Sequence, residues 1–113
     1  MNTCTLTKLR IANLLRYESL YDFALFLRML RQCVGVSRRL VAHDTGLSKT
    51  KLFHLEYGHF MFQPKTVDLR TLANYYGIPW KILLRKSELF IVQHKNRPKY
   101  ASVKESFTRE QHA

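Results

Sequence analysis

The sequence is poor in cysteine, in acidic residues and in long apolar runs. Its two cysteines, Cys4 and Cys33, lie far apart and outside any Cys-x-x-Cys pattern, so we expect free thiols and no disulfide framework. The unbroken apolar stretches, such as residues 89–92, are far too short to span a bilayer. No long apolar run follows the positive residues near the N-terminus, and we therefore expect neither a signal peptide nor a transmembrane helix.

The sequence also lacks the arrangements that enzymes and metal sites need. It contains no Gly-x-Ser-x-Gly, His-Glu-x-x-His or Walker motif, and its 8 acidic residues are scattered. His54 and His59 lie close in the sequence, but no set of cysteines or carboxylates stands at ligand spacing beside them. We expect a protein without catalytic activity, metal or cofactor.

Positive charge is what the sequence has in excess. Lysine and arginine number 19 against 8 aspartates and glutamates, which gives a net charge of +11 at pH 7. The excess is spread through the chain and is not confined to one basic tail. The expected partner is a polyanion, although charge alone does not separate a nucleic acid from an anionic membrane surface.

Glycine occurs only 4 times, mostly at positions typical of helix ends. Gly35, Gly46 and Gly77 each follow a segment whose apolar residues repeat at helical spacing. Helical segments that each end at a glycine predict an all-α protein with a compact domain of five or six helices. The expected boundaries are residues 1–19 for an N-terminal helical extension, 20–92 for the domain and 93–113 for a flexible basic tail.

The first helix of the domain is expected over about 20–33, after a Ser-x-x-Asp start signal at Ser19. It is apolar on two sides, and we expect the N-terminal segment or a partner subunit to cover the second side. Residues 88–94 either extend the last helix or form a strand. A short apolar run does not distinguish the two. The other expected helices run from Ser37 to Gly46, from Ser48 to Tyr57, from a cap at Thr66 to Gly77, and onward from Pro79.

Two short capped helices joined by a turn at Gly46 are the pattern of a helix-turn-helix, here over about 37–57. On the second helix, Leu52 and Leu55 supply part of a small shared core. The pattern does not predict burial of the opposite face within the domain. That face carries Lys49, Thr50, Phe53, His54 and Tyr57.

Residues within and around this motif also fit the spacing pattern of a known family of DNA-binding domains. They stand at Val36-Ser37, Val41-Ala42, Gly46-Leu47-Ser48, Leu52, Leu55-Glu56, Gly58, Pro64, Leu72-Ala73 and Gly77-Ile78-Pro79. With these matches, residues 27–84 resemble the helix-turn-helix domain of the lambda repressor and Cro family, also called the xenobiotic-response-element family. The resemblance covers about half of the chain. It implies a lambda-repressor-like fold for the domain.

The resemblance implies that the helix at about 49–57 enters the major groove of DNA while the helix at about 38–45 crosses the backbone. The base-contacting positions of the family match Lys49, Thr50 and His54, and the same helix adds Lys51 and Phe53 as candidates. Glu56 is expected to be a hydrogen-bond partner within the fold. Contacts to DNA phosphates are expected at Arg38, Arg39, Ser48, Tyr57 and His59.

The sequence departs from the family pattern at three places. Leu40 stands where an acidic residue is usual, Thr45 stands where leucine or isoleucine is usual, and the loop over residues 58–64 is longer than the common pattern. That loop holds Phe60, Met61 and Phe62. These side chains either dock a partner protein or fold back onto the helix at 67–76.

Charge and motif together predict a sequence-specific regulator of transcription that binds an inverted repeat in double-stranded DNA as a homodimer. Repression is favoured over activation, because Arg38, Arg39 and His43 stand where activators of this family present acidic residues. Small proteins of this kind are frequent in bacteria and phages, which implies a cytoplasmic protein of a bacterium or a phage-infected host. The family commonly pairs through its last helices, and the expected dimer residues are Trp80, Leu84, Phe90 and Ile91.

Two other functions stay open from the sequence. An antitoxin-like or protein-interaction module would bind a partner through Leu40 and residues 60–62 and would contact DNA secondarily. Non-specific binding of RNA or membranes by bulk charge would depend on the number of lysines and arginines, and Thr50 and His54 would then not matter.

Overall fold

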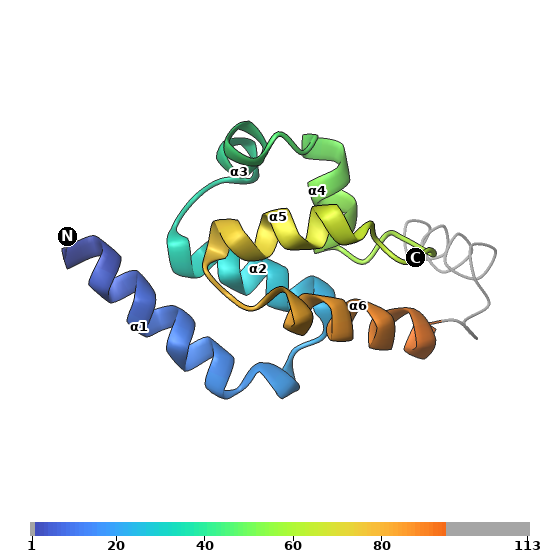
Figure 1. The fold of residues 1–113 in the computed structure, drawn as a ribbon, viewed down its shortest axis with the longest axis horizontal. Helices are drawn as coiled ribbons and strands as arrows, with labels where there is room; N and C mark the ends of the chain where they lie inside the picture. The colour runs from blue at the N-terminus through green and yellow to red at the C-terminus, as the bar shows by residue number, and fades with distance from the viewer. Residues whose placement is uncertain (1, 95–113) are drawn as a thin grey trace, which may run out of the picture.

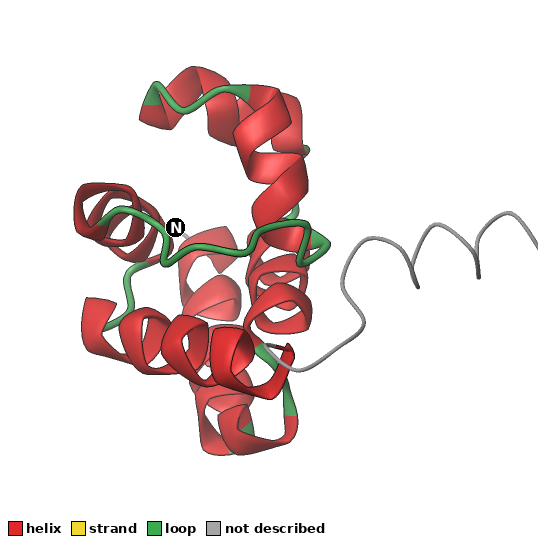
Figure 2. Cartoon of the chain, turned by 90° about the vertical axis from the view of Figure 1, so that its right-hand side faces the viewer, coloured by secondary structure: helices red, strands yellow, loops and turns green. Residues whose placement is uncertain are grey.

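The computed structural model describes residues 2–94 and places them in seven helical elements (Figure 1). Within that range there is no strand, and loops alone join the helices (Figure 2). The expectation of an all-α protein is therefore confirmed. The elements are α1 (Asn2–Arg16), the 3-10 helix η1 (Glu18–Leu20), α2 (Phe23–Val34), α3 (Arg38–Thr45), α4 (Lys49–Glu56), α5 (Thr66–Tyr76) and α6 (Trp80–His94).

Both terminal parts of the described range 2–94 are helical. Most of the segment 1–19 is helical, as α1 and η1. Residues 88–94 continue α6, so they form a helix and not a strand. The expected basic tail begins at residue 93, and its residues 95–113 lie outside the described part of the chain.

Capping side chains start three of the helices, and two of these caps, Ser37 and Ser48, were predicted. Asp22, Ser37 and Ser48 each accept a hydrogen bond from the backbone amide three residues later, at 2.8, 3.1 and 3.0 Å. Each such bond satisfies one of the amides that a first helical turn leaves without a partner. The starts of α3 and α4 are therefore encoded locally.

Two predicted helix starts are wrong. The first helix of the domain begins at Phe23 and not at residue 20, because residues 18–20 form η1 and Asp22 is the cap. Thr66 is the first residue of α5 and not its cap, since the preceding Lys65 takes the cap position without a side-chain hydrogen bond. Local signals placed these helices but missed their first residues.

The core is built around α2. Phe23, Phe26, Leu27 and Leu30 are 0 to 1% exposed, and α2 contacts α1, α4, α5 and α6. Each such side chain contributes about 1.5–3 kcal/mol through burial. The second apolar side of α2 is covered by α1, whose Ile11 and Leu14 are buried. The N-terminal segment therefore provides the expected cover.

The long loop after α4 folds back onto the core. The ring of Phe60 lies between Phe23 and Phe90, with ring centroids 5.5 and 5.1 Å away. Phe60 thus folds back onto the protein and stacks on rings of α2 and α6, whereas the expectation named the helix at 67–76. The other two apolar side chains of the loop stay on the surface, with Met61 40% and Phe62 84% exposed.

Lys86 joins η1 to α6 from a buried position. Its ammonium group forms an ion pair with Glu18 at 2.8 Å and donates to the backbone carbonyl groups of Glu18 and Tyr21. It also lies 4.9 Å from the centroid of the Phe26 ring. Arg85 reaches the second carboxylate oxygen of Glu18 at 2.7 Å. These contacts hold the turn between α1 and α2 against the last helix.

Gly58 is expected to tolerate no side chain. Its φ of +71° lies in the left-handed region, and an added Cβ would stand 2.5 Å from Cζ of the buried Phe90 ring. Gly58→Ala should lower the free energy of unfolding by about 2–4 kcal/mol, from backbone strain and overpacking together. Gly35→Ala is the matched control, because its φ is +79° but nothing lies within 4 Å; it should cost about 1 kcal/mol. Equal losses in urea unfolding would contradict this account.

The ion pair of Glu18 predicts a pH dependence of stability. The hydrogen bond from Lys86 lowers the pKa of Glu18 below its usual value. The ionised carboxylate therefore stabilises the fold above the usual pKa, and this contribution disappears as the pH falls through the lowered pKa of the folded state. Glu18→Gln should reduce the free energy of unfolding by about 2 kcal/mol at pH 7. The difference from the wild type should shrink on acidification from about pH 5 to pH 3. Urea midpoints that differ equally at all pH values would refute the prediction.

Candidate nucleic-acid interface

The α3–α4 pair, which we define as residues 37–57, forms one side of the molecule, at the top of Figure 1. The two helices pack against each other and turn Val41, Leu52 and Leu55 into the interior. Gly46 ends α3 with a φ of +81°. Thr45 closes the turn: its hydroxyl donates to the carbonyl of Val41 at 2.7 Å and accepts from the amide of Leu47 at 3.2 Å. These two hydrogen bonds satisfy the hydroxyl of Thr45 within the turn.

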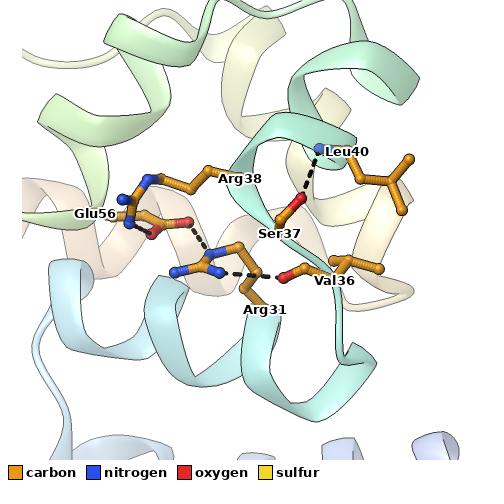
Figure 3. A network of polar contacts seen from close by, with 6 residues as sticks. All are labelled: Arg31, Val36, Ser37, Arg38, Leu40 and Glu56. Carbon is orange, nitrogen blue, oxygen red and sulfur yellow. Dashed lines mark hydrogen bonds and ion pairs between the residues drawn. The ribbon is translucent and has the colours of Figure 1, made fainter.

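Glu56 anchors the pair to α2 from a buried position (Figure 3). Its side chain is 2% exposed and accepts from Arg31 Nε at 2.9 Å and from Arg38 Nη1 at 3.2 Å. Arg31 also donates to the carbonyl of Val36 at 3.1 Å, in the connection between α2 and α3. The carboxylate therefore links three helices, and the expectation that Glu56 is a hydrogen-bond partner within the fold is confirmed.

The outer face of α4 consists of side chains that the fold does not bury. Lys49, Thr50 and His54 are exposed, and Phe53 and Tyr57 are 39% and 42% exposed. These are the residues that helical spacing placed opposite Leu52 and Leu55. The arrangement leaves one long cation, one hydroxyl, one imidazole and two aromatic rings facing outward from a rigid helix.

Aromatic rings and arginines stack along this face. The ring centroids of Phe53 and Tyr57 lie 4.9 Å apart, and that of His59 lies 5.6 Å from that of Phe53. Arg38 lies 5.4 Å above the Phe53 ring and Arg28 lies 4.7 Å above the Tyr57 ring. Such cation–π contacts restrict the arginines while leaving their positive charge at the surface. The role of Arg28 was not expected from the sequence, because only the tertiary fold brings α2 next to Tyr57.

Besides Arg38, which is paired with Glu56, two of the expected DNA contacts are already engaged in the free protein. Lys51 Nζ forms an ion pair with Asp68 of α5 at 3.0 Å, so its ammonium group is held toward α5 and away from the free face. The hydroxyl of Ser48 caps α4. Arg39 and Lys49, by contrast, are exposed and have no ion pair within residues 2–94.

A pocket of about 440 Å³ opens between the beginnings of α3 and α4. Three of its lining residues are cations and none is acidic, so the pocket favours an anionic ligand. The lining consists of Ser37, Arg38, Arg39, Lys49, Thr50 and Phe53.

The residues expected at a dimer interface lie on α6 with unequal exposure. Phe90 is 6% exposed and stacks on Phe60 and His94, so it belongs to the core, contrary to the expectation that it lies at a dimer interface. Trp80, Leu84 and Ile91 are only partly buried. The Trp80 ring is also covered by Arg70, 4.2 Å from its centroid.

Other kinds of site are not visible among residues 2–94. No three histidine, cysteine or acidic side chains gather there in a way that could hold a metal ion. No helix of that range is long and apolar enough to cross a membrane. Cys33 is a free thiol, and burial raises its pKa.

No protein-family model, no curated protein and no solved structure matches the chain. The function is therefore inferred from the geometry and charge of the α3–α4 pair.

The Glu56 network predicts an order of stability losses. Glu56→Ala leaves two arginines without their buried partner and should lower the free energy of unfolding by about 3–5 kcal/mol. Arg31→Met should cost less, and Arg38→Met least, because the side chain of Arg38 is 32% exposed against 18% for Arg31. Denaturant unfolding of the three variants checks the order. A loss in Glu56→Ala no larger than in Arg38→Met would exclude the carboxylate as the anchor.

Proposed function

We propose that the protein is a sequence-specific DNA-binding regulator of transcription and that its α3–α4 pair is a lambda-repressor-like helix-turn-helix. The main support is the outer face of α4, where Lys49, Thr50 and His54 are exposed on a helix whose opposite face is buried. A net charge of +11 gives the chain an affinity for a polyanion. The motif resemblance supports the same function independently of charge.

In this proposal α4 enters the major groove and its side chains read base edges. Lys49 can donate to O6 and N7 of guanine, and Thr50 can exchange hydrogen bonds or contact a thymine methyl group. His54 can donate to an acceptor on a base edge. Phe53 offers an apolar contact, and Lys51 must leave Asp68 before it can contribute.

The phosphate backbone is expected to lie along the first turn of α3 and the rim of α4. Arg39 is free for such a contact, whereas Arg38 can contact phosphate only from its place beside Glu56 and the Phe53 ring. These charges set register and supply affinity that depends on salt. Tyr57 and His59 extend the same surface at the end of α4.

The expected target is an inverted repeat bound by a homodimer, with half-site centres about 34 Å apart. The partly buried Trp80, Leu84 and Ile91 on α6 are the remaining candidates for the dimer contact. We infer repression and not activation, because occupying a promoter requires no additional acidic surface, and α3 presents Arg38, Arg39 and His43. The regulator is expected to act in the cytoplasm.

Selection of duplexes from a random DNA pool at about 150 mM salt tests the proposal, since specific binding must survive the screening of bulk charge. The wild type is compared with the triple variant Lys49→Ala, Thr50→Ala, His54→Ala and with Lys8→Ala on the exposed part of α1. A palindromic motif enriched by the wild type and by Lys8→Ala, but lost in the triple variant, is the expected result. Equal retention of unenriched DNA by all three proteins would refute specific readout.

One observation favours a second candidate function. Phe62 is 84% exposed and Met61 40% exposed in the loop after α4, and exposed apolar side chains of this kind mark protein-binding surfaces. An antitoxin-like or other protein-interaction module would use this loop for a partner protein. Failure of the DNA selection, together with one stoichiometric protein captured by the wild type but not by Phe62→Ser, would favour this second function.

A further inference from the structure

The pocket between α3 and α4 has features beyond those that a groove-reading face needs. It is bounded on one side by the first turn of α3 and on the other by the first turn of α4. The first amides of a helix have no partner within the helix, and its N-terminal end carries partial positive charge. Two such ends next to one hollow make it favourable for a negatively charged group.

Side-chain charge acts in the same direction. Arg39 and Lys49 line the pocket, and neither forms an ion pair within residues 2–94. Arg38 also lines it, but Glu56 and the neighbouring rings hold this arginine in place. Two free cations and one fixed cation, with no acidic residue in the lining, match the charge of a phosphate group.

The sixth lining residue adds an apolar surface. Phe53 is 39% exposed, and Tyr57, His59 and Arg38 lie against its ring. A ring fixed in this way offers a flat surface on which a planar heterocycle can stack. The hollow has a volume of about 440 Å³ and is open to solvent, so a bound ligand would stay partly exposed.

We propose that this pocket binds a nucleotide, with the phosphate at Arg39, Lys49 and the two helix ends and the base on Phe53. A free nucleoside monophosphate and one nucleotide unit of a single strand both present such a phosphate and such a base. Because the lining overlaps the outer face of α4, an occupied pocket would exclude duplex DNA. That last consequence rests on the proposed function, whereas nucleotide binding itself does not.

Titration of the isotope-labelled full chain, without DNA and at constant ionic strength, tests the pocket directly. Inorganic phosphate and adenosine monophosphate are added separately while backbone amide resonances are followed. Both ligands should give saturable shifts concentrated in residues 37–39 and 49–53. The monophosphate should bind about tenfold more tightly, because one stacked base adds to the phosphate contact.

Three variants separate the parts of the site. Arg39→Gln with Lys49→Gln should weaken both ligands about tenfold or more, as expected for loss of two charge-assisted contacts. Phe53→Ala should lower the affinity for the monophosphate to that for phosphate and leave the affinity for phosphate unchanged. Lys8→Gln with Arg16→Gln, two exposed residues of α1, is the matched control and should change neither affinity. Equal losses in the control, or a monophosphate no tighter than phosphate, would overturn the proposal.

Two further measurements identify the source of the ligand and keep the proposals distinct. A short single-stranded oligonucleotide that shifts the same amides more tightly than the monophosphate assigns the pocket to a strand, and equal affinity assigns it to the free nucleotide. Both results support the phosphate-and-ring chemistry. Nucleotide binding without any selected DNA motif would refute the proposed function alone. A selected motif with no shift of residues 37–53 on adding the monophosphate would refute the pocket alone.

Discussion

The position of α4 depends on one buried carboxylate. Glu56 is 2% exposed and holds Arg31 of α2 and Arg38 of α3 through both of its oxygens. A charge at this depth is tolerated only because it is paired and hydrogen-bonded. The last turn of α4 is thereby fixed to two other helices, and the outer face of its first turn is left exposed. The exposure of Lys49 and Thr50 follows from this fixed geometry.

A second constraint joins the end of α4 to the last helix. Phe60 lies between Phe23 and Phe90, and Gly58 passes so close to Phe90 that only a hydrogen fits at its Cα. Gln63 donates to the hydroxyl of the buried Ser87 at 2.6 Å and adds a polar contact to the same interface. The long loop after α4 is therefore held to the core at Gly58, Phe60 and Gln63. Met61 and Phe62 between these contacts stay exposed.

Much of the fold was predictable because its signals are local. Ser37 and Ser48 cap their helices through atoms only three residues away, and the glycines at three helix ends adopt the left-handed backbone expected of them. The outward residues of α4 were also predictable from helical spacing. The pairing of Lys51 with Asp68 was not, because the two residues are distant in sequence and no pattern links them. The burial of Phe90 depends on a loop whose path has no local code.

The sequence by itself determined the helical class, most helix ends, the excess of positive charge and the residues that share the outer face of α4. These properties arise from side chains acting on their own or neighbouring backbone. Only the tertiary structure decided which charges stay free: Arg39 and Lys49 have no ionic partner within residues 2–94, whereas Lys51, Arg38 and Lys86 are paired. Ion pairs, ring stacking and pockets form between segments far apart in the chain. Their geometry is set by how the helices pack around α2 and not by any one helix.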